Sequence, residues 1–121
     1  MKLPSVVTTL LSASLLFVAT SGEANDPPTF PGQPHINSAL KHLTSAREKA
    51  PTDAPGALGE LAAASGELAR ASKNKGTYKN IARQLTDQAT QYLQKGEPDK
   101  AVHKIDEAIA NTNRAGETGD H

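Results

Sequence analysis

The stretch over residues 77–114 constrains the fold most, because it combines a continuous helical period with clear stop and start signals. Apolar residues recur there at spacings of three and four positions, which is the period of an amphipathic helix. In its middle, Lys95 and Gly96 are a strong helix stop, and Pro98 is a helix start. The stretch therefore predicts two helices folded back on each other, with Thr77 as the N-cap of the first.

Two further helices are predicted upstream, over residues 36–50 and 55–72, separated by Pro51 and Pro55. Four amphipathic helices with short turns and no strand signal predict an all-α, up-and-down antiparallel four-helix bundle. The residues expected to face its core, helix by helix, are Ile36, Ala39, Leu40, Leu43, Ala46 and Ala50; Leu58, Leu61, Ala62, Ser65, Leu68 and Ala69; Tyr78, Ile81, Ala82, Leu85, Ala89, Tyr92 and Leu93; and Ala101, Val102, Ile105, Ala108, Ile109 and Thr112.

The first 24 residues have the layout of a secretory signal peptide: a lysine near the start, an apolar run over 6–19, and then small residues. Cleavage after Ala24 or after Ser21 fits the small side chains there. An uncleaved anchor is disfavoured, because the run is shorter than the ~20 residues that span a bilayer. The chain has no cysteine, which excludes lipid modification and disulfides. We therefore expect a periplasmic or secreted protein with no membrane span after cleavage.

The rest of the chain divides into three parts. Residues 25–34 are rich in proline and predict an extended leader, in which Phe30 is the one anchoring candidate. Residues 35–114 are the predicted bundle, a single domain in a chain of 121 residues. Residues 115–121 have no apolar pattern and are predicted to be a disordered tail.

Composition excludes several classes of function. The formal net charge is zero, so bulk composition does not indicate a polyanionic partner, and aromatic residues make up 3% of the chain, so few side chains could stack on nucleic-acid bases. The sequence contains no nucleophile-elbow motif, no phosphate-binding glycine loop and no carboxylate cluster in an apolar setting. We predict that the protein is not an enzyme and has no cofactor.

Histidines are the candidate metal ligands. His35 and His42 stand seven positions apart at the edge of the apolar stripe of residues 36–50. A helical metal site more often uses ligands four positions apart, and no cysteine motif for haem attachment occurs. A metal site at His35 and His42 is thus the less favoured interpretation, and solvated histidines are the more favoured one.

The most asymmetric charge feature is the run Arg70, Lys73, Lys75, Lys79 and Arg83, with no acidic residue between Glu67 and Asp87. Backbone N–H groups at the start of the helix that follows would point toward an anion bound there. A solvated loop explains the run equally simply and is favoured as a default. The run remains the candidate anion-binding site of the chain.

The stretch 77–114 resembles a single tetratricopeptide repeat. The resemblance is carried by Leu85, Ala89, Tyr92, Gly96, Ala101, Ile105 and Ala108, which follow the alternation of large and small residues in that repeat. Such repeats need about three copies to form a peptide-binding groove. The resemblance therefore implies a helical hairpin and no receptor function.

Most of the chain after residue 24 also resembles small exported bacterial all-helical proteins of uncharacterised function. The stretches that carry this likeness are QPHINSALKHLTSAREKA and ASKNKGTYKNIARQLTDQA. Together these features predict a non-enzymatic exported interaction or structural module, with a protein partner or a second copy as its ligand. The alternative is a small-anion or metal-binding protein that uses the basic run or the two histidines.

Overall fold

The computed structural model describes residues 29–71 and 76–118 of the chain. The predicted signal peptide, residues 25–28 of the leader, Lys73 and Lys75 lie outside the described residues. Within them, all regular structure is helical and no strand occurs. The helices are α2 (Pro34–Lys49), α3 (Ala54–Arg70), α4 (Thr77–Gln94) and α5 (Pro98–Glu117).

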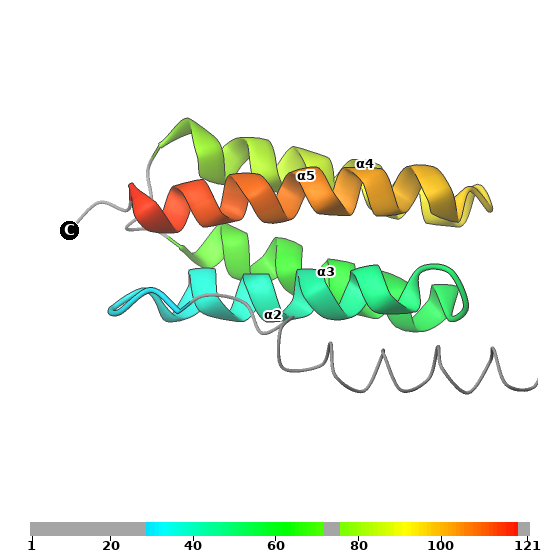
Figure 1. Ribbon diagram of the computed structural model, residues 1–121, viewed down its shortest axis with the longest axis horizontal. Helices are drawn as coiled ribbons and strands as arrows, with labels where there is room; N and C mark the ends of the chain where they lie inside the picture. The colour runs from blue at the N-terminus through cyan, green and yellow to red at the C-terminus, as the bar shows by residue number, and fades with distance from the viewer. Residues whose placement is uncertain (1–28, 72–75, 119–121) are drawn as a thin grey trace, which may run out of the picture.

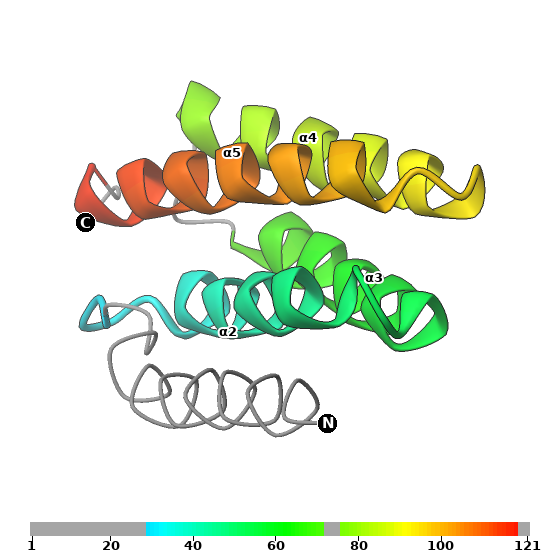
Figure 2. The ribbon, with the colours of Figure 1, turned by 45° about the vertical axis from the view of Figure 1, so that its right-hand side comes forward.

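The helices form the predicted up-and-down bundle. Each helix packs against the next one in the chain, and α5 closes the arrangement against α2. The hairpin of α4 and α5 lies as one layer over the hairpin of α2 and α3 (Figures 1 and 2). None of the described helices is both long enough and apolar enough to span a bilayer.

Proline and glycine set the helix ends, as the sequence predicts. Gly96 has a φ of 77°, and its N–H donates to the carbonyl of Leu93 at 3.0 Å while the N–H of Glu97 donates to Tyr92 at 2.9 Å. This pair of bonds satisfies the last carbonyls of α4 and reverses the chain before Pro98. One detail is wrong: Gly76 is the N-cap of α4, and Thr77 is already helical and makes no capping bond.

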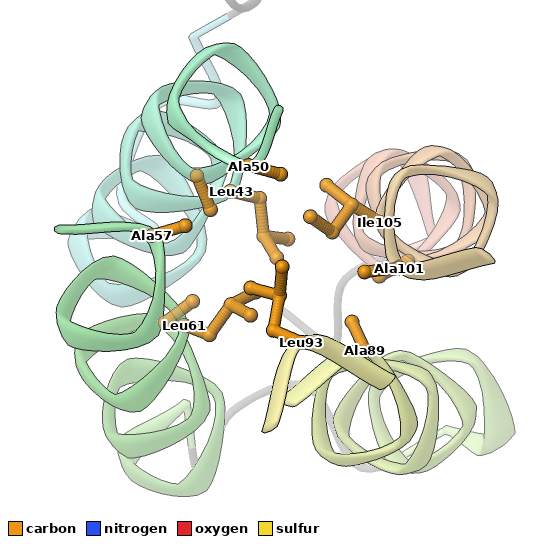
Figure 3. Close-up of a cluster of buried hydrophobic side chains, with 11 residues drawn as sticks. Leu43, Ala50, Ala57, Leu61, Ala89, Leu93, Ala101 and Ile105 are labelled. Carbon is orange, nitrogen blue, oxygen red and sulfur yellow. The ribbon is translucent and has the colours of Figure 1, made fainter. Parts of the chain in front are cut away.

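Side chains at alternating three- and four-residue spacing fill the bundle interior, with helices seen end-on around them in Figure 3. The prediction for residues 36–50 is confirmed in full, since all six predicted side chains are buried. In α3 the prediction is partly wrong. Ala57 and Ala64 are buried beside Leu61 and Leu68, whereas the predicted Ala62 and Ala69 are exposed. Alanines occur all around this helix, so their pattern could not distinguish the inner face.

Helix α4 turns three small residues and one leucine inward. Ala82, Thr86, Ala89 and Leu93 are buried, while the larger predicted core residues Tyr78, Ile81, Leu85 and Tyr92 are only half-buried. In α5, Val102 and Ile109 are likewise half-buried, and Ala101, Ile105, Ala108 and Thr112 are buried. The apolar side of the second hairpin is thus divided between the core and a partly exposed flank.

Two threonines divide the core into two apolar clusters. One cluster lies around Leu61 and Ile105, and the other around Leu40 and Leu68. Thr86 and Thr112 fall between them along α4 and α5, and both are fully buried. Each hydroxyl donates to the carbonyl four residues earlier, at 2.8 Å. The hydroxyls are therefore satisfied within their own helices and present their methyl groups to the core.

The two ends of the described chain meet. Phe30 packs against the second cluster, and a Cβ on Gly116 would lie 2.5 Å from its ring. Asn37 holds the backbone of Phe30 through two hydrogen bonds of 2.8 and 3.0 Å, and Gln33 donates to the carbonyl of Gly116 at 2.9 Å. The predicted anchor is confirmed. The predicted disordered tail is wrong for residues 115–117, which continue α5 because Phe30 covers Gly116.

Candidate functional site

Both predicted metal-ligand histidines pair with glutamates of α3. Nδ1 of His35 lies 2.6 Å from Oε1 of Glu67, and Nδ1 of His42 lies 2.7 Å from Oε1 of Glu60. A carboxylate only accepts hydrogen bonds, so each Nδ1 is the donor. The two histidines are seven residues apart, and so are the two glutamates. Because α2 and α3 are antiparallel, the two pairs lie about two helical turns apart along the α2–α3 contact.

These pairs keep the histidines apart. Seven residues of helix separate the rings by about 10 Å along the axis. In the part of the chain that the structure describes, no three histidine, aspartate or glutamate side chains converge to hold a metal ion. The arrangement is that of two cross-helix ion pairs, and the structure does not bring His35 and His42 into one coordination sphere.

Glu60 has a second hydrogen-bond partner, because Nζ of Lys49 lies 2.8 Å from its Oε2. The hydrogen bonds from Lys49 and His42 lower the pKa of Glu60, and the Glu60 carboxylate raises the pKa of Lys49. A separate ion pair joins Arg47 of α2 to Asp106 of α5, and it raises the pKa of Arg47. The charges on α2 are thus used to hold neighbouring helices.

Three of the five residues of the predicted anion site fall in the described chain. Nζ of Lys79 donates to the carbonyl of Ala71 at 3.1 Å and so closes the end of α3. Arg70 is exposed and lies 3.7 Å from the carboxylate of Glu67. Arg83 is exposed on α4. The structure adds Arg114, at the end of α5, to the same end of the bundle.

The two tyrosines lie on one side of α4, fourteen positions apart, and each contacts nearby cationic side chains. The guanidinium carbon of Arg114 is 5.7 Å from the ring centre of Tyr78. Nζ of Lys100 is 5.7 Å, and Nζ of Lys95 6.0 Å, from the ring centre of Tyr92. These distances are typical of cation–π contacts. Since Lys100 and Arg114 belong to α5, both tyrosines lie where α4 and α5 meet.

Two open hollows flank Tyr92. One, of about 380 Å³, is lined by Tyr92, Asp99, Lys100, His103 and Lys104. The other, of about 280 Å³, is lined by Gln88, Gln91, Tyr92, Lys95 and Lys104. Neither encloses a chamber that would separate a reacting substrate from water. A half-buried tyrosine beside such hollows is suited to contact the surface of another molecule.

We call the surface around the two tyrosines the α4–α5 seam. It consists of the row at helical spacing on α4 and the cations that border it: Tyr78, Ile81, Leu85, Gln88 and Tyr92, with Lys95, Lys100, Lys104 and Arg114. Within the described residues, no ion pair joins α4 to α5: the carboxylates nearest the seam, Glu97 and Glu107, pair with Lys100 at 3.0 Å and Lys104 at 3.6 Å within the same helix or its cap.

Sequence reasoning missed several of these residues. The match between the spacing of Glu60 with Glu67 and that of His35 with His42 is visible in the sequence and would have predicted the ion pairs. No sequence signal places Arg114 over Tyr78, because that contact depends on how α5 returns along α4. No protein-family model matches the chain, and no curated protein and no solved structure matches it significantly.

Proposed function

We propose that the protein is a non-catalytic exported module, periplasmic or secreted, that binds a partner protein through the α4–α5 seam. One observation carries this proposal: α4 buries two alanines, a threonine and one leucine, Leu93, while it leaves four larger side chains half-buried, namely Tyr78, Ile81, Leu85 and Tyr92. A helix that only had to fill the core would turn its largest apolar residues inward. Tyrosine and arginine at a half-exposed apolar surface are typical of the residues that dominate protein interfaces.

Charge distribution supports the same surface. The ion pairs of α2 and α3 are made across the bundle, so those side chains are already engaged. On the seam, by contrast, Lys95 and Arg114 contact tyrosine rings, and within the described residues neither has a carboxylate within 4.0 Å. These cations can therefore bind an acidic group of a partner without giving up a carboxylate of their own chain.

Site-specific photo-cross-linking tests the proposal in cells that make the protein. A photoreactive side chain at Gln88 or Gln91, both exposed on or beside the seam, should give a discrete cross-linked product. The same group at Lys41, which is exposed on α2, is the matched control and should give none. The product should be lost when Tyr92 is replaced by alanine, and its mass distinguishes a second copy of the chain from another protein.

Equal labelling at all three positions, or labelling at Lys41 alone, would refute an interface at the seam. No product at Gln88 and Gln91 under conditions where the protein is folded would do the same. Circular dichroism of each variant provides the folding check.

A second candidate function is binding of a small anion at the bundle end that carries Arg70, Lys79, Arg83 and Arg114. The observation that favours it is that α4 begins there without a capping side chain and without an acidic residue in its first turn. Inorganic phosphate should then raise the thermal midpoint of the protein, and Arg83→Ala should abolish that rise while Lys100→Ala leaves it unchanged. An equal rise in both variants would indicate a general salt effect.

A further inference from the structure

We infer that the α4–α5 seam accepts an acidic amphipathic segment of the partner, whose carboxylates reach both tyrosine–cation sites at once. This inference rests on the proposed function and names the chemistry of the partner. It follows from three observations: each of the two sites combines a tyrosine ring with cationic side chains, the sites lie a fixed distance apart on α4, and the surface between them is uncharged and partly apolar.

The first site is Tyr78 with Arg114. Tyr78 is half-buried against the second apolar cluster, so its ring is fixed, and the exposed guanidinium of Arg114 lies over it. A guanidinium offers paired N–H donors that match both oxygens of a carboxylate. Arg114 has no described carboxylate within 4.0 Å, so its donors can pair with a carboxylate of a ligand. A carboxylate next to an apolar side chain would therefore contact both members of the pair.

The second site is Tyr92 with Lys95 and Lys100. Glu97 lies 3.0 Å from Lys100, so Lys95 is the cation here that has no carboxylate partner among the described residues. The hollow of about 280 Å³ lies between Lys95, Tyr92 and Lys104, with Gln88 and Gln91 as its remaining walls. This hollow is large enough for a carboxylate side chain, and the two glutamines supply amide donors for it.

Spacing connects the two sites. Fourteen residues of α4 separate the tyrosines, which corresponds to about 21 Å along the helix. Ile81 and Leu85 lie half-buried between them, and Gln88 is uncharged. The one carboxylate of α4, Asp87, is directed to α3, where Ser65 donates to it at 3.4 Å. A helical partner of about four turns, acidic at both ends and apolar between them, complements this surface.

A uniformly charged polyanion fits less well. Glu97, Asp99 and Glu107 lie near the Tyr92 site and would repel closely spaced negative charges. Nucleic acid and anionic lipid present such closely spaced charges, whereas an amphipathic helix places its carboxylates at separate positions. A discrete pair of carboxylates on an apolar scaffold is thus the favoured chemistry.

Synthetic peptides test this inference with the full-length mature protein. The main probe is an alanine-based helix with glutamates fourteen positions apart and leucines on the same face between them. A second peptide places the glutamates seven positions apart, and a third replaces them by lysines. Because the chain has two tyrosines and no tryptophan, intrinsic tyrosine fluorescence reports directly on Tyr78 and Tyr92 when the peptides contain neither residue.

The fourteen-spaced peptide should bind saturably and more weakly as salt rises. The seven-spaced peptide should bind less tightly, and the lysine peptide should not bind. Arg114→Ala and Lys95→Ala should each weaken binding of the first peptide about two- to fivefold. Lys41→Ala, at an exposed cation on α2 that belongs to neither candidate site, is the matched control and should have no effect.

Equal affinity for the two glutamate peptides, or an equal loss in Lys41→Ala, would overturn the inference in favour of non-specific charge attraction. Failure of all peptides combined with cross-linking at Gln88 and Gln91 would leave the interface in place and refute the acidic partner. Failure of both experiments would refute the interface itself.

Discussion

The two hairpins of the bundle use similar helices for different purposes. Among the largest fully buried side chains, α2 and α3 contribute Ile36, Leu40, Leu43, Leu61 and Leu68, whereas α4 and α5 contribute Ile105 and two threonines. The first hairpin closes its helix contact with His–Glu and Lys–Glu pairs. The second closes its contact with tyrosine–cation pairs and leaves large apolar side chains half-buried.

This difference indicates a division of roles. A hairpin that contributes most of the large core residues and satisfies its charges internally stabilises the fold. A hairpin that directs alanine and threonine to the core can keep its tyrosines at the surface, because the first hairpin fills the volume. The stability of the bundle should therefore be more sensitive to substitutions in α2 and α3 than to substitutions on the α4–α5 seam.

The largest effect is expected from Leu61→Ala, which leaves a cavity in the cluster shown in Figure 3. Removal of a fully buried leucine should lower the free energy of unfolding by about 2–5 kcal/mol. Leu85→Ala is the matched variant on the seam and should lower it by less, since Leu85 is already half-exposed. Urea unfolding followed by circular dichroism measures both, and equal losses would contradict the division of roles.

A smaller effect on stability is expected from substitutions at Gly116, where Phe30 of the N-terminal segment packs on the end of α5. Gly116→Ala places a Cβ 2.5 Å from the ring of Phe30 and should displace that ring, with a loss of about 1–2 kcal/mol. In a Phe30→Ala background the same change should stabilise α5, because alanine exceeds glycine in helix propensity by up to ~1 kcal/mol.

In the double-mutant cycle of these two positions, Gly116→Ala should therefore lower the stability of the wild-type protein and raise the stability of the Phe30→Ala variant. An additive cycle would show that Phe30 does not pack on Gly116 in solution. The thermal midpoint of the four proteins, measured at one protein concentration, provides the cycle.

Glu60→Gln tests the ion pairs of the first hairpin and should lower the free energy of unfolding by up to about 1 kcal/mol at pH 7. Contacts with Lys49 and His42 lower the pKa of Glu60 in the folded state. Its contribution is therefore present above its ordinary pKa of about 4.5 and is lost as pH falls below it. The difference between the two proteins should shrink as the pH falls below about 4.5.

The matched control for the second hairpin is Glu107→Gln, because Glu107 pairs only within α5 in the described structure. Its effect should be smaller at pH 7. Chemical unfolding at several pH values measures both, and a larger effect of Glu107→Gln would reverse the assigned roles of the hairpins.

The smallest effect is expected from Thr86→Val, which makes the core face of α4 more like that of the first hairpin. The hydroxyl bonds only to the carbonyl of Ala82, and that carbonyl keeps its helical partner, so no buried group is left unsatisfied. The change should be neutral or stabilising by less than about 1 kcal/mol, as judged from the urea midpoint. Thr90→Val, at a half-buried position, is the control, and a marked loss in Thr86→Val alone would indicate that the hydroxyl has a further role.

Much of the architecture was determined by the sequence alone. Pro98 and the pair Lys95–Gly96 set helix ends through local backbone preferences, which act without help from distant residues. Pro34 was predicted to lie in the extended leader, and this was wrong because it is the first residue of α2. The period of branched apolar residues placed the inner face of α2 correctly for the same reason. An all-helical bundle with these boundaries could be predicted because every signal for it is contained within a few turns of chain.

The inner faces of α3 and α4 and the composition of the candidate site were decided only by the tertiary structure. Alanine fits both the core and the surface, so the choice of Ala57 and Ala64 over Ala62 and Ala69 depends on which face the neighbouring helices cover. Arg114 reaches Tyr78, and Glu67 reaches His35, only after the hairpins have formed. These contacts join residues far apart in sequence, and their energy depends on packing geometry that no local pattern encodes.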